Sequence, residues 1–300
     1  GPVIVSAALR RRKEAGSVVS LGAGPWRVRF HPVRDDLVSI IIPTRDRCDL
    51  LKQCVDSIEK HTRHVRYEII VADNGTTDSA TLHYLDTLAR RHRVFRYPGA
   101  FNYSAINNEG VKRAGGAYLL FLNNDTEVLA ADWLSDMVGQ AQRPEVGGVG
   151  VKLLYSDGRI QHAGVVLGVC GVAGHAFRHC SNAYPYYHGL SDVMRSCSAV
   201  TGACLMVSRT LFDEVGGFDE HLPVEFNDVD LCLKIRQRGY RIVYDPAVVL
   251  YHHENATRKG RLSPSDEKRF VDQWGNLLVK GDPYYNPNLT LHREDWSLDI

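Results

Sequence analysis

The chain has 300 residues, a length that suits one large domain or two smaller ones. Lys and Arg number 36 and Asp and Glu number 35, so the net charge of +1 argues against a protein dedicated to binding nucleic acid. The hydrophobic fraction of 44% can fill a core and excludes intrinsic disorder. No apolar run approaches the roughly 20 residues that span a bilayer and no secretory signal is visible, so the sequence predicts no transmembrane segment.

The seven cysteines are scattered and odd in number, which is a poor basis for a disulfide framework. No CxxC pair is present, and this argues against a structural zinc site. Cysteine usage of this kind is typical of a protein in the reducing cytoplasm. The chain begins with Gly1-Pro2, which resembles a protease-cleavage scar, so we expect the natural chain to extend further upstream.

The first half of the sequence alternates short apolar runs, rich in β-branched residues, with amphipathic stretches. The runs predict strands at Val38–Thr44, Tyr67–Asp73, Val94–Tyr97 and Tyr118–Leu122, of which the first, second and fourth are expected to be buried. Apolar spacing and capping residues predict helices at Asp49–Lys60, after Thr77 or Asp78, from a cap at Ser104 to about Ala114, and near Ala131–Gln142. This order predicts an α/β fold with a Rossmann-like, doubly wound, mostly parallel central sheet.

The second half is less regular and predicts a smaller subregion beside the sheet. We expect a long loop over residues 168–187, helices at Asp228–Gln237 and Pro264–Lys280, and strands at Val149–Tyr155, Gly164–Val169, Ala199–Val207 and Tyr240–Tyr244. Asp245-Pro246 is expected to close the last strand. We therefore divide the chain into a linker or the end of a preceding domain (1–36), a main domain (37–260) and a C-terminal helix and tail (261–300).

Three of the predicted strands end in polar clusters, which are Thr44-Arg45-Asp46, Asp73-Asn74-Gly75 and Asn123-Asn124-Asp125. Each cluster alone is compatible with an ordinary turn, since Asp, Asn and Gly are turn residues. In an open α/β sheet, however, ligands bind outside the carboxyl ends of the strands. Three polar ends on one edge predict a site for ribose hydroxyls, base edges and phosphates.

The usual phosphate-binding loops are absent, because the sequence contains neither GxxxxGK[ST] nor GxGxxG. A P-loop ATPase and a dinucleotide-binding site are therefore disfavoured. A diphosphate bound at this edge would need a cation instead. Asp125 follows a buried strand and is a natural oxygen ligand for Mg²⁺ or Mn²⁺.

Six segments, in this order, resemble the family-two inverting nucleotide-sugar glycosyltransferases of the GT-A fold. They lie between Val38 and Arg258 and read VSIIIPTRDR, YEIIVADNGTTD, FNYSAINNEGVKRAGGAYLLFLNND, SAVTGACLMVSRTLFDEVGGFDE, FNDVDLCLKIRQRGYRIVYDP and LYHHENATR. A further segment, DPYYNPNLTLHREDWSL, resembles the tail of bacterial O-antigen or surface-polysaccharide glycosyltransferase modules such as rhamnosyltransferases. Such modules often sit in larger chains with further catalytic domains. The resemblance implies a nucleotide-sugar half at 37–127 and an acceptor half at 128–260.

The resemblance also implies roles on the donor side. Asn124-Asp125 matches the metal motif of the family, in which Asp125 keeps the metal-binding carboxylate and Asn124 replaces an acid and suits a ribose hydroxyl. The implied cation is Mn²⁺ or Mg²⁺. Asp73 matches the acid that receives a pyrimidine base. The other donor-binding positions that match are Thr44, Asp46, Asn102 and Asn107.

The general base implied by the resemblance is Asp228, the second acid of a Glu-Asp pair at the start of a helix. Here the first acid is replaced by Asn227, whose amide cannot accept the proton. A helix N-cap is the alternative interpretation of Asp228. If the base lies elsewhere, Glu225 and Asp230 are the next candidates.

Two pairs of histidines occur in the second half. His252 matches a third metal ligand of the GT-A fold, with adjacent His253 as the second choice. His162 and His175 lie in Gly-flanked loops. They are candidates for contact with the acceptor, although a structural role is the favoured interpretation.

The resemblance therefore implies an inverting transferase that moves a sugar from a UDP- or dTDP-sugar to a hydroxyl of a growing glycan. The acceptor would be lipid-linked or soluble, at the cytoplasmic face of the membrane, and peripheral membrane contact is compatible with this. Asn124 and Asn227 keep open a second function, a catalytically degenerate module that binds glycan or acts as a scaffold. A sugar-nucleotide pyrophosphorylase ranks lower, because no Gly-rich loop follows the first strand.

Overall fold

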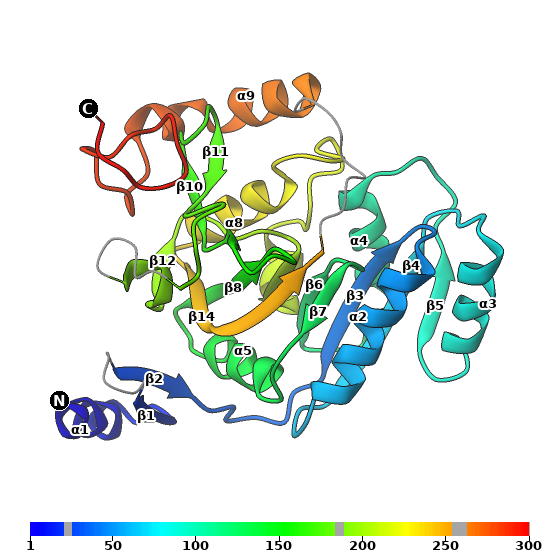
Figure 1. The fold of residues 1–300 in the computed structure, drawn as a ribbon, viewed down its shortest axis with the longest axis horizontal. Coiled ribbons are helices and arrows are strands. Elements are labelled where there is room, and N and C mark those ends of the chain that lie inside the picture. The colour runs from blue at the N-terminus through cyan, green and yellow to red at the C-terminus, as the bar shows by residue number, and fades with distance from the viewer. Residues whose placement is uncertain (21–25, 184–188, 254–262, 300) are drawn as a thin grey trace.

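The computed structural model describes residues 1–20, 26–183, 189–253 and 263–299. Within these residues, one mixed sheet of ten strands forms the centre of the molecule (Figure 1). Its first half is parallel and consists of β3 (Val38–Thr44), β4 (Tyr67–Asp73), β5 (Arg93–Arg96) and β6 (Tyr118–Leu122). Its second half consists of β7 (Thr126–Val128), β8 (Val146–Leu154), β9 (Ile160–His162), β12 (Arg195–Cys197), β13 (Cys204–Ser208) and β14 (Arg241–His252).

Helices cover both faces of this sheet, as a doubly wound fold requires. One face carries α2 (Cys48–His61), α3 (Ser79–Leu88) and α5 (Trp133–Ala141). The other carries α4 (Tyr103–Arg113), α7 (Arg209–Glu214), α8 (Asn227–Gln237) and α9 (Pro264–Lys280). Successive residues of β3 separate accordingly, since Ile40 and Ile42 join the first core and Ile41 joins the second. The predicted α/β class is confirmed.

The N-terminal segment folds into α1 (Pro2–Arg12) and a hairpin of β1 (Gly16–Ser20) and β2 (Trp26–Phe30). The hairpin contacts α5, where Arg29 Nε donates to Asp136 Oδ1 at 2.6 Å. The backbone of Phe30 approaches so closely that a Cβ at Gly139 would lie 2.0 Å from its carbonyl oxygen. None of the helices in the described residues is long and apolar enough to cross a membrane.

Three sequence-based expectations are corrected by the structure. Asn102, rather than Ser104, caps α4, because its side chain accepts from the Ala105 amide. The predicted strand 199–207 begins only at Cys204, and the resulting β13 lies antiparallel between β6 and β8. The predicted loop 168–187 contains β11 (Ala173–His175), which pairs with β10 (Val165–Leu167).

A fourth correction concerns β14, which does not end at Asp245-Pro246. It continues to His252, with a register shift against β8 between Asp245 and Val249. This irregularity accommodates Pro246, which has no N–H to donate to a ladder. The extension is important because it brings His252 to the edge where β6 ends.

Asp230 of α8 forms polar contacts with α9. We expect its truncation to cause a large loss of stability. Its fully buried carboxylate accepts from Gln273 Nε2 at 2.9 Å and Trp274 Nε1 at 3.0 Å, and it pairs with Lys234 at 2.9 Å. Asp230→Ala would leave the buried Trp274 Nε1 without its acceptor and Lys234 without its counter-charge, so we expect the free energy of unfolding to fall by about 3–5 kcal/mol. Urea denaturation measures this.

Asp272→Ala is the matched control, since it removes the exposed i,i+4 pair with Lys268 on the surface of α9. An exposed pair of this kind contributes about 0.5 kcal/mol or less. If the two variants lost the same free energy of unfolding, the contacts of Asp230 with α9 would not be important for stability.

Candidate active site at the carboxyl ends of the strands

The first and third polar clusters meet where β3 and β6 end, and the second follows β4 beside them. Thr44 and Asp73 are directly paired across β3 and β4. Asn124 reaches from the turn after β6 and donates its Nδ2 to Thr44 Oγ1 at 2.9 Å. Parallel strands thus bring Thr44, Asp73 and Asn124 to one edge of the sheet, as the sequence predicts.

Asp46 and Asp73 organise the turn that follows β4. Asp46 has a left-handed backbone with φ of 53°, and its Oδ1 accepts from the amides of Thr77 and Asp78 at 2.8 and 2.9 Å. These two backbone hydrogen bonds hold the pKa of Asp46 below its usual value. Asp73 is buried, and its Oδ1 accepts from the Thr76 amide at 2.8 Å. A nucleoside contact for either carboxylate remains a prediction.

The other two residues predicted to bind the nucleotide-sugar donor, Asn102 and Asn107, form hydrogen bonds within the protein. Asn102 caps α4 and donates its Nδ2 to the Glu220 carbonyl at 2.8 Å. Asn107 is fully buried, and its Nδ2 donates to the Tyr103 carbonyl at 2.9 Å. These contacts give both amides a structural role, and donor binding by them stays a prediction.

Asp125 and His252 face each other at this edge. Asp125 Oδ1 lies 3.0 Å from His252 Nε2, although 127 residues separate the two in the sequence. The adjacent His253 points elsewhere, since its Nε2 lies 2.8 Å from Glu127 Oε2 and its Nδ1 lies 2.8 Å from Ser156 Oγ. Of the two histidines, His252 is therefore the one that is placed beside Asp125.

The hydrogen bonds of His252 define which of its ring nitrogens carries the proton. Nδ1 lies 2.6 Å from Gln161 Oε1, a carbonyl oxygen that can only accept, so Nδ1 carries the hydrogen. Nε2 lies 3.2 Å from Asn123 Nδ2, an amide nitrogen that can only donate, so Nε2 keeps its lone pair. Both contacts indicate the same neutral tautomer.

In this tautomer the lone pairs of His252 Nε2 and Asp125 Oδ1 face each other at 3.0 Å, whereas a second proton on the imidazole would make the same contact an ion pair. Asp125 Oδ1 is buried and makes no hydrogen bond in the described residues. Imidazole nitrogen and carboxylate oxygen together suit Mn²⁺. The described residues contain no group of three or more His, Cys, Asp or Glu side chains that would complete a metal site. The pair therefore fits a cation whose other ligands come from substrate and water.

Asp228 lies at the start of α8, after Phe226, whose backbone is left-handed with φ of 60°. Its Oδ2 accepts from the Gly202 amide at 2.7 Å and its Oδ1 from its neighbour Val229 at 2.8 Å. The side chain is only partly buried. Ala203, next to Gly202, accepts at its carbonyl from the Asn123 amide at 3.1 Å. The turn before β13 therefore joins Asp228 to the turn that carries Asp125.

The neighbours of Asp228 have structural roles. Asp230 is fully buried in the network with Lys234 and α9, so it is not placed to receive a proton from a substrate. Asn227 is also buried and donates its amide to the carbonyls of Leu222 and Val224 at 3.4 and 3.1 Å. An amide can make these contacts and a carboxylate cannot, so Asn227 has a structural role at this position.

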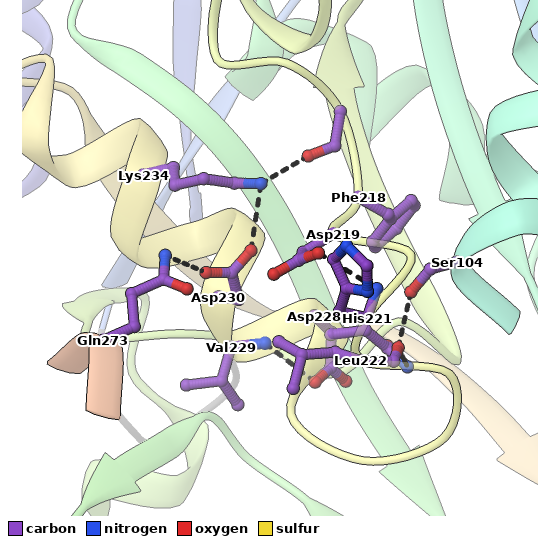
Figure 2. Close-up of polar contacts among 12 residues, drawn as sticks. Ser104, Phe218, Asp219, His221, Leu222, Asp228, Val229, Asp230, Lys234 and Gln273 are labelled. Atoms are coloured by element: carbon purple, nitrogen blue, oxygen red, sulfur yellow. Dashed lines mark hydrogen bonds and ion pairs between the residues drawn. The ribbon is translucent and has the colours of Figure 1, made fainter. Parts of the chain in front are cut away.

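The segment 216–222 contacts both α4 and α8, as Figure 2 shows in part. Ser104 donates to the Leu222 carbonyl at 2.7 Å, and Lys234 donates to the Gly217 carbonyl at 2.6 Å. An open hollow of about 710 Å³ lies beside this segment. Most of its charged groups are already paired within the protein, as Arg269 is with Asp219 at 2.9 Å, so we assign the hollow no ligand.

His162 and His175 form a buried pair, with ring centroids 4.8 Å apart. His162 is fully buried, and its Nε2 accepts from the Gly164 and Thr201 amides at 3.2 and 3.4 Å. Burial, together with the nearby charges of His175 and Arg195, holds the pKa of His162 well below its usual value. These contacts support the structural interpretation of the pair.

Sequence reasoning missed two residues that support the site. Gly202 presents its amide to Asp228, and Gln161 accepts from His252. Gly202 lies within a segment that carries the family resemblance, but a backbone amide leaves no chemical signal in a sequence. Gln161 stands beside His162, which the sequence does single out.

The fold is that of the GT-A class of glycosyltransferases. Two solved structures share the fold. One is the mannosyltransferase PcManGT from Pyrobaculum calidifontis in complex with GDP-Man and Mn²⁺, with a TM-score of 0.57, 19% identity and coverage of 86% of this chain and 66% of that one. The other is GalNAc-T7 with UDP, GalNAc and Mn²⁺, with a TM-score of 0.64, 17% identity and coverage of 81% and 50%.

Residues 39–216 match the model of glycosyl transferase family 2, and the chain belongs to this family. It is 46% identical over 272 residues to an uncharacterised protein, y4gI, of Sinorhizobium fredii, covering 87% of this chain and 30% of the relative. It is 41% identical over 302 residues to the O-antigen biosynthesis protein RfbC of Myxococcus xanthus, covering 97% and 23%. The chain thus spans less than a third of the length of either relative.

The buried state of His162 predicts a loss of stability in mild acid. Because its pKa is lower in the folded protein than the ordinary value of about 6.5, the unfolded chain takes up the proton first as the pH falls. The stability that neutral His162 contributes is present above pH 6.5 and is lost as the pH falls towards the folded pKa. When the pH falls from 7.5 to 5.5, we expect the free energy of unfolding of His162→Gln to decrease by roughly 1 kcal/mol less than that of the wild type.

Urea denaturation at the two pH values measures this difference. His83→Gln, which alters an exposed histidine, should retain the wild-type dependence. A His162→Gln protein with an unchanged dependence on pH would show that the proton is taken up elsewhere.

Proposed function

We propose that this chain is an inverting, metal-dependent glycosyltransferase. It moves a sugar from a UDP- or dTDP-sugar to a hydroxyl of a growing bacterial surface glycan. The observation that carries the proposal is the facing pair of Asp125 and His252, whose lone pairs meet at the edge where a diphosphate would bind. Membership of glycosyl transferase family 2 supports the reaction class.

Asp125 Oδ1 and His252 Nε2 would hold the cation. Two of the solved structures that share the fold contain Mn²⁺, which supports this metal for the present chain. When bound, the cation supplies positive charge that stabilises the departing diphosphate. The protein contributes a pair of ligands at the point where β7 begins and its neighbour β14 ends, and Asn124 beside them offers its amide to a ribose hydroxyl.

Asp228 is proposed as the general base. The acceptor hydroxyl would give its proton to the carboxylate as its oxygen bonds to the anomeric carbon, while the bond from that carbon to the diphosphate breaks. Both carboxylate oxygens accept from backbone amides, which orients the group, and each keeps a further lone pair. Direct displacement of this kind inverts the anomeric centre.

The donor base is proposed to be a pyrimidine, read by Asp73 at the end of β4. Its oxygens can accept from the ring N–H of uracil or thymine. Calorimetric titration with Mn²⁺ and UDP, dTDP or GDP tests this choice, and tightest binding of GDP would make it wrong. The two solved structures do not decide it, because one contains GDP-Man and the other UDP.

The acceptor is proposed to be an O-antigen-like glycan, lipid-linked or free. The likeness to the O-antigen biosynthesis protein of Myxococcus xanthus supports this. The reaction would take place in the cytoplasm, at the inner face of the membrane where such glycans are built. Because the chain matches 23% of that relative's length, further catalytic domains in the natural chain belong to the same proposal.

If Asp125 and His252 form the metal site, substitution of either one should weaken Mn²⁺-dependent binding of the nucleotide. Asp125→Ala and His252→Ala each remove one of the two protein ligands, so we expect Mn²⁺-dependent binding of UDP to weaken by at least about tenfold, with the fold intact. Isothermal titration calorimetry measures the affinity. His253→Ala is the control, since His253 pairs with Glu127, and it should bind as the wild type does. Unchanged binding by Asp125→Ala would contradict the assignment.

The general base predicts a selective loss of turnover. Asp228→Asn removes the proton acceptor, so we expect turnover to fall by about 100- to 10,000-fold while donor affinity barely changes. Because both oxygens accept from backbone amides, the amide group leaves one N–H unpaired, and stability should also fall by about 1 kcal/mol. Glu225→Gln, which alters the alternative base, should retain most of the turnover. If Glu225→Gln instead lost much more turnover than Asp228→Asn, the general base would be Glu225.

A further inference from the structure

Gln161 is a buried residue that contacts both His252 and His175. It lies in β9, which pairs with β8, and its side chain is only about 2% exposed. Its Oε1 lies 2.6 Å from His252 Nδ1, and its backbone carbonyl accepts from His175 Nδ1 at 3.1 Å. Neither the family resemblance nor the proposed mechanism gives this residue a role.

We infer that Gln161 is a positioning residue that holds His252 in the Nδ1–H tautomer, so that the Nε2 lone pair is available to a divalent cation beside Asp125. The inference rests on the proposed function, because that proposal places the cation there. It concerns the chain's own proton arrangement, however, and this can be measured without metal or substrate.

Gln161 and Asn123 both favour this tautomer, but only Gln161 can do so while a cation is bound. Asn123 donates to Nε2, which is the atom that the cation needs, so the two compete. Gln161 contacts the opposite ring nitrogen, and that contact survives when Nε2 is occupied. Histidines that bind metals commonly donate their other N–H to an acceptor, which fixes the tautomer and the ring orientation.

Removal of this acceptor has a definite consequence. Without Gln161 Oε1, a hydrogen on the buried Nδ1 would have no partner at that position. A hydrogen on Nε2 would instead find Asp125 Oδ1 at 3.0 Å. The imidazole would therefore change to the Nε2–H tautomer, and the hydrogen bond to Asp125 would occupy both atoms that are meant for the cation.

The first test reads the tautomer directly. Two-bond ¹H–¹⁵N correlation spectra of protein labelled at the histidine ring nitrogens distinguish the two tautomers, and His252→Ala assigns the signal. At pH 8 and without metal, we expect His252 of the wild type to carry its hydrogen on Nδ1. Gln161→Leu should move it to Nε2, and Gln161→Glu, whose carboxylate also accepts, should restore the wild-type pattern.

The second test measures the affinity for Mn²⁺ from the free-ion signal in electron paramagnetic resonance, with and without UDP. Gln161→Leu should bind Mn²⁺ about 10- to 100-fold more weakly, and Gln161→Glu should recover the affinity. Gln53→Leu is the control, since Gln53 is an exposed glutamine that contacts His253 rather than His252, with its Nε2 3.3 Å from His253 Nε2. This variant should bind as the wild type does.

The outcomes separate the inference from the function on which it rests. A wild-type spectrum with the hydrogen on Nε2 overturns the role of Gln161 even if every Gln161 variant fails to fold. A folded Gln161→Leu protein that keeps both the wild-type tautomer and the wild-type affinity also overturns it. If the wild type binds no Mn²⁺ with any nucleotide, the proposed metal site is wrong, and the spectrum still decides whether Gln161 sets the tautomer.

Discussion

The contact between Asp125 and His252 is the constraint on which the arrangement of the site depends. The two side chains come from opposite halves of the chain, and backbone pairing holds them together. β7, which directly follows Asp125, pairs antiparallel with the end of β14, where Thr126 lies opposite His252. The His253 amide also donates to the Asp125 carbonyl at 2.8 Å. The sheet itself therefore keeps these two side chains 3.0 Å apart, and the proposed cation would bind beside them.

The rest of the site is placed relative to this pair by the short turn that precedes β13. Its Gly202 amide holds Asp228, its Ala203 carbonyl accepts from Asn123, and the Gly202 carbonyl accepts from Tyr103 Oη at 2.8 Å. A Cβ at Gly202 would lie 2.9 Å from that hydroxyl, so the close approach needs glycine. The proposed leaving-group side and the proposed base thus share one backbone segment, and a shift of either would move the other.

The sequence predicts the parallel half of the fold because three of its four strands, β3, β4 and β6, are apolar runs with polar ends. It fails at β14, where proline is a stop signal, because the register shift that accommodates Pro246 depends on the neighbouring strand. It also misplaces the cap of α4, since Asn102 and Ser104 are both good capping residues and only the tertiary contact of Ser104 with Leu222 separates them. At the site, side chains with strong chemistry were recognised, whereas the amide donors and Gln161 became evident only from the packing.

Asp228 and Asp230 show that the presence of an acidic residue in the first turn of a helix does not by itself identify a general base. Both are acids in the first turn of α8, where either would favour the helix dipole. At 3.6 residues per turn, two positions differ by about 200° around the axis, so the two carboxylates point to opposite sides. Asp230 is directed at α9 and is fully enclosed by donors from Lys234, Gln273 and Trp274. Asp228 is directed at the Gly202 turn, where backbone amides orient it and part of its surface stays accessible. A proton acceptor for a substrate must be both oriented and reachable, and of these two acids only Asp228 meets both conditions.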